Sequence, residues 1–261
     1  MEQESNMGSD LHITQAQPFS EFALVYDDFM HYIDYPGWVN YICEILNFYG
    51  IKGRKLLDLA CGTGKCATLF ANHGFEVIGI DLSPDMLAQA INKVETKELN
   101  IKFLCQDMRN FKINSPVNIV VCLYDSLNYL LEKNDLEHTF SSVYTALEQG
   151  GGFIFDMNTE YAIHKVWGNR TWQRNERGIK SVWKSEYDHK AHINTLHLIW
   201  TTKENGIKKK HYEIHKETFY TNDDVKNLLK KVGFKEVVVY AHNTFQPPIE
   251  VTARIMVVAL K

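Results

Sequence analysis

The chain has 261 residues, 45% of them hydrophobic, which suffices for one large α/β domain or a domain with an insertion. Its 28 basic and 32 acidic residues give a net charge of -4. This balance excludes a global electrostatic attraction to nucleic acid or an anionic membrane, so a small or neutral partner is expected.

The cysteine content and the N-terminus point to a cytoplasmic protein. The five cysteines are odd in number and lack the paired close spacing of a zinc finger, so we expect free thiols and no structural metal. The polar N-terminal stretch has no signal-peptide pattern, and no segment approaches the roughly 20 apolar residues that span a bilayer. Residues 1–20 are therefore predicted to be a flexible N-terminus.

The next part of the chain predicts a mainly parallel sheet. Apolar residues at helical spacing predict a leading helix over residues 35–49. Short apolar runs then alternate with helical stretches, which is typical of βαβ units with right-handed crossovers. A helix that opens near Asn134 is expected to end at Gly150. The expected strands are residues 55–59, 75–81, 101–107, 117–124 and 151–158.

The alternation breaks after the fifth strand. Residues 158–218 are rich in aromatic and β-branched side chains, with turn signals at 176–178, 188–190 and 205–206, and predict an inserted antiparallel β lid of three or four strands. A helix over 221–233 and two further strands return to the main sheet. We thus predict a Rossmann-like domain of residues 21–157 and 219–261.

The stretch LLDLACGTGK, residues 56–65, predicts a binding site at the end of the first parallel strand. Its small residues let a ligand lie against the backbone, and the following helix points amide groups at it. Asp81 ends the second strand, where a carboxylate can accept hydrogen bonds from both ribose hydroxyls. Together these features predict a cofactor that contains a nucleoside.

The choice of cofactor depends on the acidic residues. The letters GTGKCA also satisfy the dinucleotide fingerprint. Asp58, however, is a poor neighbour for a pyrophosphate and a good one for an ammonium group, which S-adenosylmethionine offers together with a sulfonium and no phosphate. Asp107 ends the third strand, where it can receive the adenine amino group while Met108 covers the ring.

Four stretches in order, LLDLACGTGK, VIGIDLSPDML, FLCQDMRNF and LYDSLNYL, resemble motifs I to IV of the class I S-adenosylmethionine-dependent methyltransferases. The segment FSEFALVYDDFM is similar to the N-terminal part of bacterial small-molecule and sugar N-methyltransferases. The resemblance implies a seven-stranded sheet whose last strand is antiparallel. It also implies cofactor contacts from Tyr26, Asp58, Ala60, Cys61, Gly62, Gly64, Asp81, Leu82, Met86, Gln106, Asp107, Met108, Leu123 and Tyr124.

This resemblance leads to a methyltransferase that acts on a small-molecule acceptor by in-line N- or O-methylation. An amine acceptor needs no strong base, whereas a hydroxyl acceptor makes His215, Tyr129 and Tyr220 the candidate catalytic residues. The histidines of the insert lack metal-ligand spacing on a strand. Aromatic residues there could line an acceptor pocket, namely Tyr161, Trp167, Trp172, Trp183, Tyr187 and Trp200.

Four other interpretations stay open. The absence of an Asn/Asp-Pro-Pro-Tyr/Phe stretch after the fourth strand argues against nucleobase amino groups, but an RNA or protein acceptor is an alternative within the enzyme class. An NAD(P)-dependent oxidoreductase would leave Asp58 and Asp107 unexplained. A non-catalytic cofactor-binding module would bind without turnover. The sequence leaves the oligomeric state open.

Overall fold

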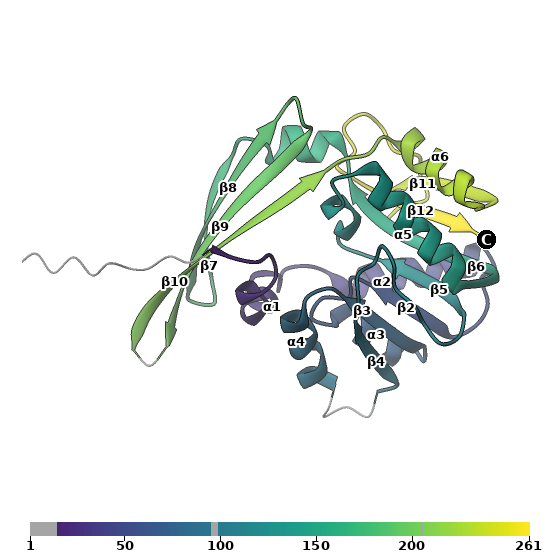
Figure 1. Ribbon diagram of the computed structural model, residues 1–261, viewed down its shortest axis with the longest axis horizontal. Helices are drawn as coiled ribbons and strands as arrows, with labels where there is room; N and C mark the ends of the chain where they lie inside the picture. Colours follow the sequence, from purple (N-terminus) through teal and green to yellow (C-terminus); the bar gives the residue numbers. More distant parts are fainter. Residues whose placement is uncertain (1–14, 95–98, 205) are drawn as a thin grey trace, which may run out of the picture.

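A seven-stranded, mainly parallel sheet forms the centre of the computed structural model, which describes residues 15–94, 99–204 and 206–261. Within these residues the strand order is β11-β12-β6-β5-β2-β3-β4, and β12 runs antiparallel to both of its neighbours (Figure 1). The strands are β2 (Lys55–Leu59), β3 (Glu76–Asp81), β4 (Ile101–Cys105), β5 (Val117–Cys122), β6 (Leu147–Asn158), β11 (Glu236–Ala241) and β12 (Arg254–Leu260). The predicted fold class is confirmed, including the antiparallel last strand.

Helices cover both faces of this sheet. On β2, Leu56 packs into the cluster beneath α2 (Tyr35–Phe48) and α3 (Lys65–Asn72), whereas Leu57 packs into the cluster beneath α5 (Lys133–Ala146) and α6 (Asn222–Val232). Successive side chains of a strand point to opposite faces, so a central strand of such a sheet is apolar at nearly every position. The remaining helix, α4 (Pro84–Val94), follows β3 and contacts β4.

The predicted antiparallel insert is a second sheet that projects from the first one (Figure 1). It contains β7 (Thr171–Glu176), β8 (Ile179–Asp188), β9 (Ile193–Glu204) and β10 (Ile207–Thr218). The short β1 (Gln15–Ala16) joins its edge, parallel to β10. Arg177 and Gly178 both have positive φ, as the tight turn between β7 and β8 requires, which confirms the turn signal there.

One local expectation was wrong, and one helix was not predicted. Helix α5 ends at Ala146 and not at Gly150, because Gly150 lies in a bulge of β6, where the β5–β6 register shifts. Its φ of 77° lets its N–H reach the carbonyl oxygen of Lys261. The insert also begins with a π-helix, Tyr161–Trp167, that no sequence signal indicated.

Three short helical segments lie near the carboxyl ends of the parallel strands: η1 (Glu21–Leu24), α1 (Tyr26–Phe29) and η2 (Ser126–Tyr129). Most of the predicted flexible N-terminus, residues 1–14, lies outside the described residues, and the domain boundaries at 157–158 and 218–219 stay predictions. Among the described residues, no helix combines the length and apolarity needed to cross a membrane.

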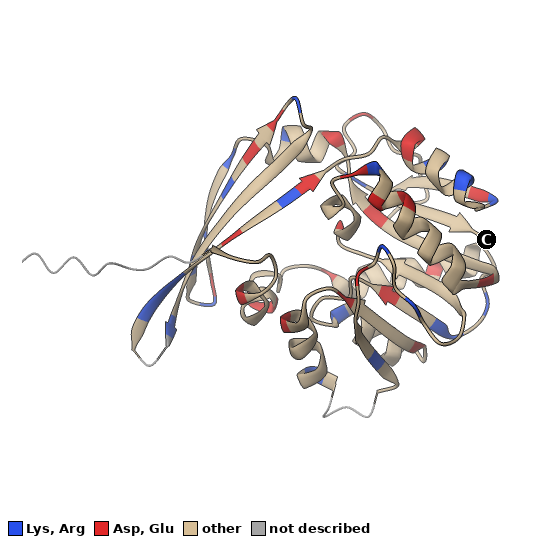
Figure 2. Cartoon of the chain, viewed as in Figure 1, with Lys and Arg blue, Asp and Glu red and all other residues tan. Residues whose placement is uncertain are grey.

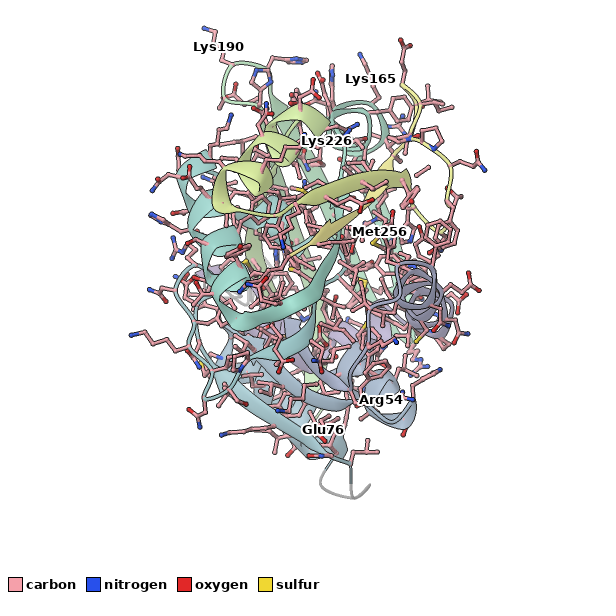
Figure 3. All side chains as sticks on the ribbon, turned by 90° about the vertical axis from the view of Figure 1, so that its right-hand side faces the viewer. Arg54, Glu76, Lys165, Lys190, Lys226 and Met256 are labelled. Carbon is pink, nitrogen blue, oxygen red and sulfur yellow. The ribbon has the colours of Figure 1, made fainter. Side chains whose placement is uncertain are left out.

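Charged residues of both signs are interspersed along the chain, as Figure 2 shows, in agreement with the balanced composition. Figure 3 shows Met256 of β12 among packed side chains, Arg54 and Glu76 at one end of the molecule, and Lys165 and Lys190 at the other. Arg54 and Glu76 mark the amino ends of β2 and β3, so functional groups are expected at the opposite edge of the sheet.

Candidate active site

A cavity of about 1070 Å³ lies at the carboxyl ends of the parallel strands. The loops after β2, β3, β4 and β5 form one wall, which we call the cofactor wall. Tyr129 of η2 and residues from β6, β8, β9, β10 and β12 form much of the other, which we call the acceptor wall. A single small-molecule site occupies about 300–1000 Å³, so this cavity has room for a nucleoside cofactor and a small second substrate.

Nearly all residues predicted to contact the cofactor line this cavity. They are Tyr26, Asp58, Ala60, Cys61, Gly62, Asp81, Leu82, Met86, Gln106, Asp107, Met108, Leu123 and Tyr124. Gly64 is not among them. It precedes α3 with a φ of 72°, and a Cβ atom there would lie 2.9 Å from Cβ of Ala90, so this glycine allows α3 to pack closely against α4.

The turn after β2 is held by Asp81. One carboxylate oxygen of Asp81 accepts a hydrogen bond from the N–H of Gly62 at 2.7 Å, and the other accepts one from the N–H of Ser83 at 2.9 Å. Each oxygen keeps a further lone pair, which can accept a hydrogen bond from a ribose hydroxyl. Asp81 thus fixes the loop that borders the cavity and can bind a ligand in it.

Asp58 presents an unmet hydrogen-bond acceptor. Its side chain is 2% exposed, and among the described residues its Oδ2 atom has no hydrogen-bond partner. Burial, reinforced by the nearby charge of Asp81, raises the pKa of Asp58 to about 7. A cationic group in the cavity would relieve both effects. The residues present therefore fit the ammonium and sulfonium groups of S-adenosylmethionine.

The part of the cavity predicted to bind adenine has an exposed apolar residue, and its acidic residue, Asp107, already accepts hydrogen bonds. Leu82 is 65% exposed and offers a flat apolar surface to a ring. Both oxygens of Asp107 accept hydrogen bonds from Arg109, whose guanidinium also lowers the pKa of Asp107. An adenine amino group would have to share this carboxylate with Arg109, so the predicted adenine contact stays a prediction.

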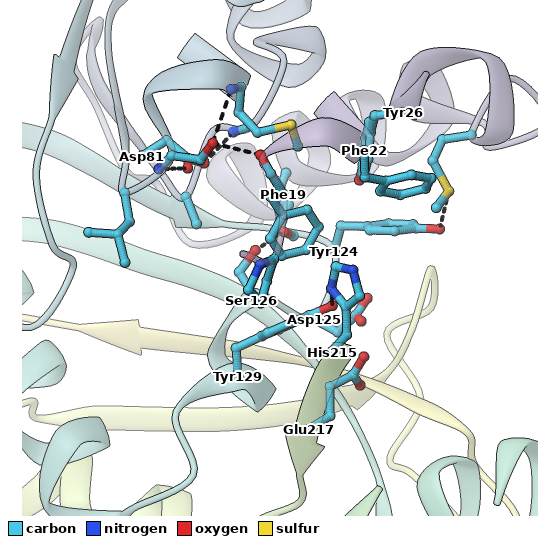
Figure 4. A pocket seen from close by; sticks show the side chains of 18 of the residues that line it. Phe19, Phe22, Tyr26, Asp81, Tyr124, Asp125, Ser126, Tyr129, His215 and Glu217 are labelled. Carbon is cyan, nitrogen blue, oxygen red and sulfur yellow. Dashed lines mark hydrogen bonds between the residues drawn. The ribbon is translucent and has the colours of Figure 1, made fainter. Parts of the chain in front are cut away.

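A segment that we call the N-terminal strap, residues 17–25, crosses the cavity. The N–H groups of Phe19 and Phe22 donate to the carboxylate of Glu213 on β10, at 2.8 and 2.9 Å. On the other side, the hydroxyl of Ser83 donates to the carbonyl oxygen of Phe19. The strap is thus tied to both walls, and Figure 4 shows Phe19 between Asp81 and His215.

The predicted catalytic residues divide into two groups. Tyr129 and His215 line the cavity, and the Tyr129 hydroxyl lies 3.3 Å from Nδ1 of His215. Tyr220 is outside the lining, and its hydroxyl donates to the carbonyl oxygen of Leu130. The predicted role of Tyr220 therefore has no support from its position.

A cluster of buried charges lies at the acceptor end of the cavity. The Arg254 guanidinium pairs with both Asp125 and Asp156. Glu217 lies beside this cluster, and burial together with the charge of Asp125 raises its pKa to about 8. Asn158 links the two regions by donating from Nδ2 to Glu217 at 3.2 Å. Two of the three carboxyl groups thus pair with the single guanidinium, and Glu217 does not.

Part of the aromatic set faces the cavity. Trp167, Trp172 and Trp183 line it, as predicted, whereas Trp200 is 1% exposed and stacks on His211. Tyr161 and Tyr187 lie outside the lining as well. The expected acceptor pocket is therefore formed by about half of the aromatic residues, as the alternation of side chains along strands requires.

Four residues in or behind the acceptor wall were not predicted from the sequence, namely Glu213, Glu217, Asn158 and Arg254, whereas His215 was predicted. Glu213, His215 and Glu217 follow one another at a spacing of two on β10, so they share one face of the strand. This alternation of ionisable residues in EIHKE was a usable signal. Arg254 and Asn158 had no recognisable sequence signal, because each is a single polar residue at the end of a strand that is otherwise largely apolar.

Comparison with known proteins agrees with this geometry. The family described as "Methyltransferase domain" matches residues 56–151. A methyltransferase homologue from Geobacillus sp. (strain WCH70), named without an acceptor, is 32% identical over 245 residues and covers 93% of this chain and 99% of its own. The dTDP-3-amino-3,4,6-trideoxy-alpha-D-glucopyranose N,N-dimethyltransferase of Streptomyces venezuelae is 30% identical over 123 residues, which is 47% of this chain and 50% of that protein.

A solved structure extends the likeness to the whole fold. The S-adenosylmethionine-dependent methyltransferase from Clostridium acetobutylicum ATCC 824 has a TM-score of 0.81 and is 27% identical, covering 92% of this chain and 97% of that one. This match and the Geobacillus match each cover more than nine tenths of the chain, so the likeness includes both the parallel sheet and the insert. The chain therefore belongs to the S-adenosylmethionine-dependent methyltransferases, enzymes whose cofactor is S-adenosylmethionine.

Proposed function

We propose that this enzyme methylates the amino group of a small-molecule acceptor held at the acceptor end of the cavity. The observation that carries the proposal is the excess of buried carboxyl groups and hydrogen-bond acceptors over cations there. Asn158 is 1% exposed, and its Oδ1 atom has no hydrogen-bond partner among the described residues. Arg254 is already shared by two aspartates, so Glu217 has no cation of its own in this cluster.

An amine complements this wall better than a hydroxyl does. A primary amine or its ammonium form brings two or three N–H donors, whereas a hydroxyl brings one. Its positive charge also interacts favourably with the buried carboxyl groups, which have lost the solvation of water. Support also comes from the Streptomyces venezuelae relative, whose name describes methylation of an amino sugar.

The chemical step needs orientation above all. S-Adenosylmethionine, when bound, supplies a methyl group that is already electrophilic because its sulfur carries a positive charge. Asp58 and Asp81 would hold its methionine and ribose parts, while Asn158 and Glu217 would place the acceptor nitrogen. Such placement of two reactants and the exclusion of water account for much of the rate acceleration in a methyl transfer. The N–CH₃ bond forms as the S–CH₃ bond breaks, and the electron pair stays on sulfur.

A paired screen tests this proposal. Formation of S-adenosylhomocysteine is measured with amines and their hydroxyl counterparts, such as 3-amino-3-deoxyglucose against glucose and glycine against glycolate. We expect turnover with members of the amine series and at least about 100-fold less with each hydroxyl partner, whose missing N–H donors leave buried acceptors unmet. Turnover of hydroxyl compounds alone would overturn the amine assignment.

The acceptor wall can be tested by a matched pair of variants. Glu217→Gln should raise the KM for an active amine about tenfold or more, since a hydrogen bond to a charged partner is worth about 1.5–3 kcal/mol. Glu186→Gln is the control, because Glu186 is an exposed glutamate on the neighbouring part of the same sheet. Equal effects of the two substitutions would exclude Glu217 from acceptor binding.

A further inference from the structure

We propose that Tyr129, His215 and Glu213 form a proton relay that leads away from the acceptor nitrogen, with Glu213 as the positioning residue. Tyr129 and His215 both line the cavity, while Glu213 lies behind His215. The inference rests on the proposed amine function in one respect: the proton that enters the relay comes from the acceptor amine. The arrangement of the three side chains stands independently of the acceptor.

The surroundings of Glu213 fix its role as a hydrogen-bond acceptor. This side chain is 0% exposed, and its two oxygens accept the N–H groups of Phe19 and Phe22 in the strap. Backbone N–H groups can only donate. Nε2 of His215 lies 3.1 Å from Oε2 of Glu213, an oxygen that already accepts one of these bonds. The carboxylate therefore receives a third N–H, from His215.

This arrangement determines the tautomer of His215. Because Nε2 carries the hydrogen that points to Glu213, Nδ1 of the neutral ring is a free lone pair. The Tyr129 hydroxyl, 3.3 Å from Nδ1, is then the donor to it. Burial raises the pKa of Tyr129 well above its ordinary value, so its phenol stays protonated and keeps an oxygen lone pair for the cavity.

The proton path follows from these three contacts. The acceptor binds as an ammonium ion, and as one of its N–H bonds breaks, the Tyr129 oxygen takes that proton and its own hydrogen passes to Nδ1 of His215. The imidazolium that forms is stabilised by the Glu213 carboxylate. The acceptor nitrogen keeps the electron pair with which it attacks the methyl carbon. No oxidant, reductant or further reactant is required.

The ionisable groups that act on Tyr129 are acidic or neutral, and the Arg254 guanidinium beyond them is paired with Asp125. Glu217 and Asp125 face Tyr129 together with Tyr124, and the position opposite His215 on β9 is Leu196. Phe19 packs edge-on against the His215 ring, with 4.8 Å between ring centroids, and also contacts Tyr129. A charge that appears on His215 thus lies among carboxyl groups and behind an aromatic ring, which favours the imidazolium and shields it from water.

The tautomer can be measured without knowing the acceptor. In protein labelled with ¹⁵N-histidine, long-range ¹H–¹⁵N spectra distinguish protonated from free ring nitrogens, and His215→Asn identifies the His215 signals. We expect Nε2–H with a free Nδ1 at neutral pH. His73 is an internal reference of the opposite tautomer, because its Nδ1 lies 2.9 Å from the carbonyl oxygen of Leu69. A His215 ring protonated at Nδ1 when neutral would overturn the relay.

Two variants separate positioning from packing. Glu213→Gln should mix the two neutral tautomers of His215, because the amide presents an N–H as well as an oxygen to Nε2. Tyr129→Phe should leave the tautomer unchanged, since Glu213 sets it. An unchanged tautomer in Glu213→Gln would refute the role of Glu213. If that variant does not fold, the spectra of the wild type and of Tyr129→Phe still decide the tautomer, and neither result depends on whether an amine is the acceptor.

Discussion

The two walls of the cavity are built in opposite ways. The cofactor wall comes mostly from loops that each follow a parallel strand between residues 56 and 130, so neighbours in the sequence are neighbours in the site. The acceptor wall gathers Tyr129 and residues from β6, β8, β9, β10 and β12, which lie more than a hundred positions apart at the extremes. The cofactor wall is thus local in sequence, whereas the acceptor wall exists only once both sheets have packed together.

The largest expected effect lies on the cofactor wall. Asp81→Ala should weaken S-adenosylmethionine binding by about 100-fold or more, because it removes two charge-assisted hydrogen bonds and loosens the turn at Gly62. Calorimetric titration gives the affinity. Asp85→Ala, which removes an exposed carboxylate that also lines the cavity, should change it less than twofold. Similar losses in both variants would contradict a specific ribose contact.

On the acceptor wall the effect should fall on turnover. Tyr129→Phe is expected to lower kcat with an active amine by roughly 100-fold, since proton transfer by a positioned group contributes about that much. The affinity for S-adenosylmethionine should stay within about twofold, which would separate the two walls. Tyr32→Phe serves as the control, because Tyr32 is a half-exposed tyrosine of the cavity rim. A full kcat in Tyr129→Phe would exclude the relay.

A smaller effect concerns pH. The pKa of Asp58 is about 7, so this carboxyl group ionises as pH rises from 5.5 to 7.5, while the ligand ammonium stays charged. The affinity for S-adenosylmethionine should therefore increase about tenfold over this range. Calorimetry at several pH values measures it. In Asp58→Asn the affinity should be lower and nearly independent of pH, and an equally steep curve in that variant would assign the effect to another group.

The smallest effect is on stability. The pKa of Glu217 is about 8 in the folded chain and near 4.5 in an unfolded one, so between these values the folded chain holds a proton that the unfolded chain has released. Its contribution to the free energy of unfolding therefore falls as pH rises through this window. Glu217→Gln does not show this loss, and its Tm relative to wild type should increase by several °C from pH 5 to pH 8. A constant difference would mean that Glu217 is not held in its protonated form.

The same contrast explains what the sequence could predict. Asp58, Gly62 and Asp81 were found because strand, turn and acid follow one another within short stretches. Glu213 and Arg254 were not, because their function depends on which face of β10 and which end of β12 meet the cavity, and this is set by the packing of two sheets. The cofactor wall was predicted almost completely, and the acceptor wall only through His215, Tyr129 and some of the tryptophans.

Errors in the elements have a similar origin. Gly150 has the left-handed backbone common after helices, but here a bulge paired with the chain end uses that conformation. The π-helix Tyr161–Trp167 buries Ala162 and Ile163, a pattern too short to distinguish from an irregular connection. For Gly150, a contact distant in sequence decided the local conformation.

The strap has a kinetic consequence. Phe19 is bonded to Glu213 through its N–H and to Ser83 through its carbonyl oxygen, and the N–H of Ser83 is in turn held by Asp81. A nucleoside that enters or leaves past this segment must break bonds on both walls at once. Opening of the strap is then a step separate from methyl transfer, and in such enzymes product release often sets the overall rate. Steady-state turnover would then report how long the used cofactor resides in the enzyme, and a single-turnover experiment would report the chemistry.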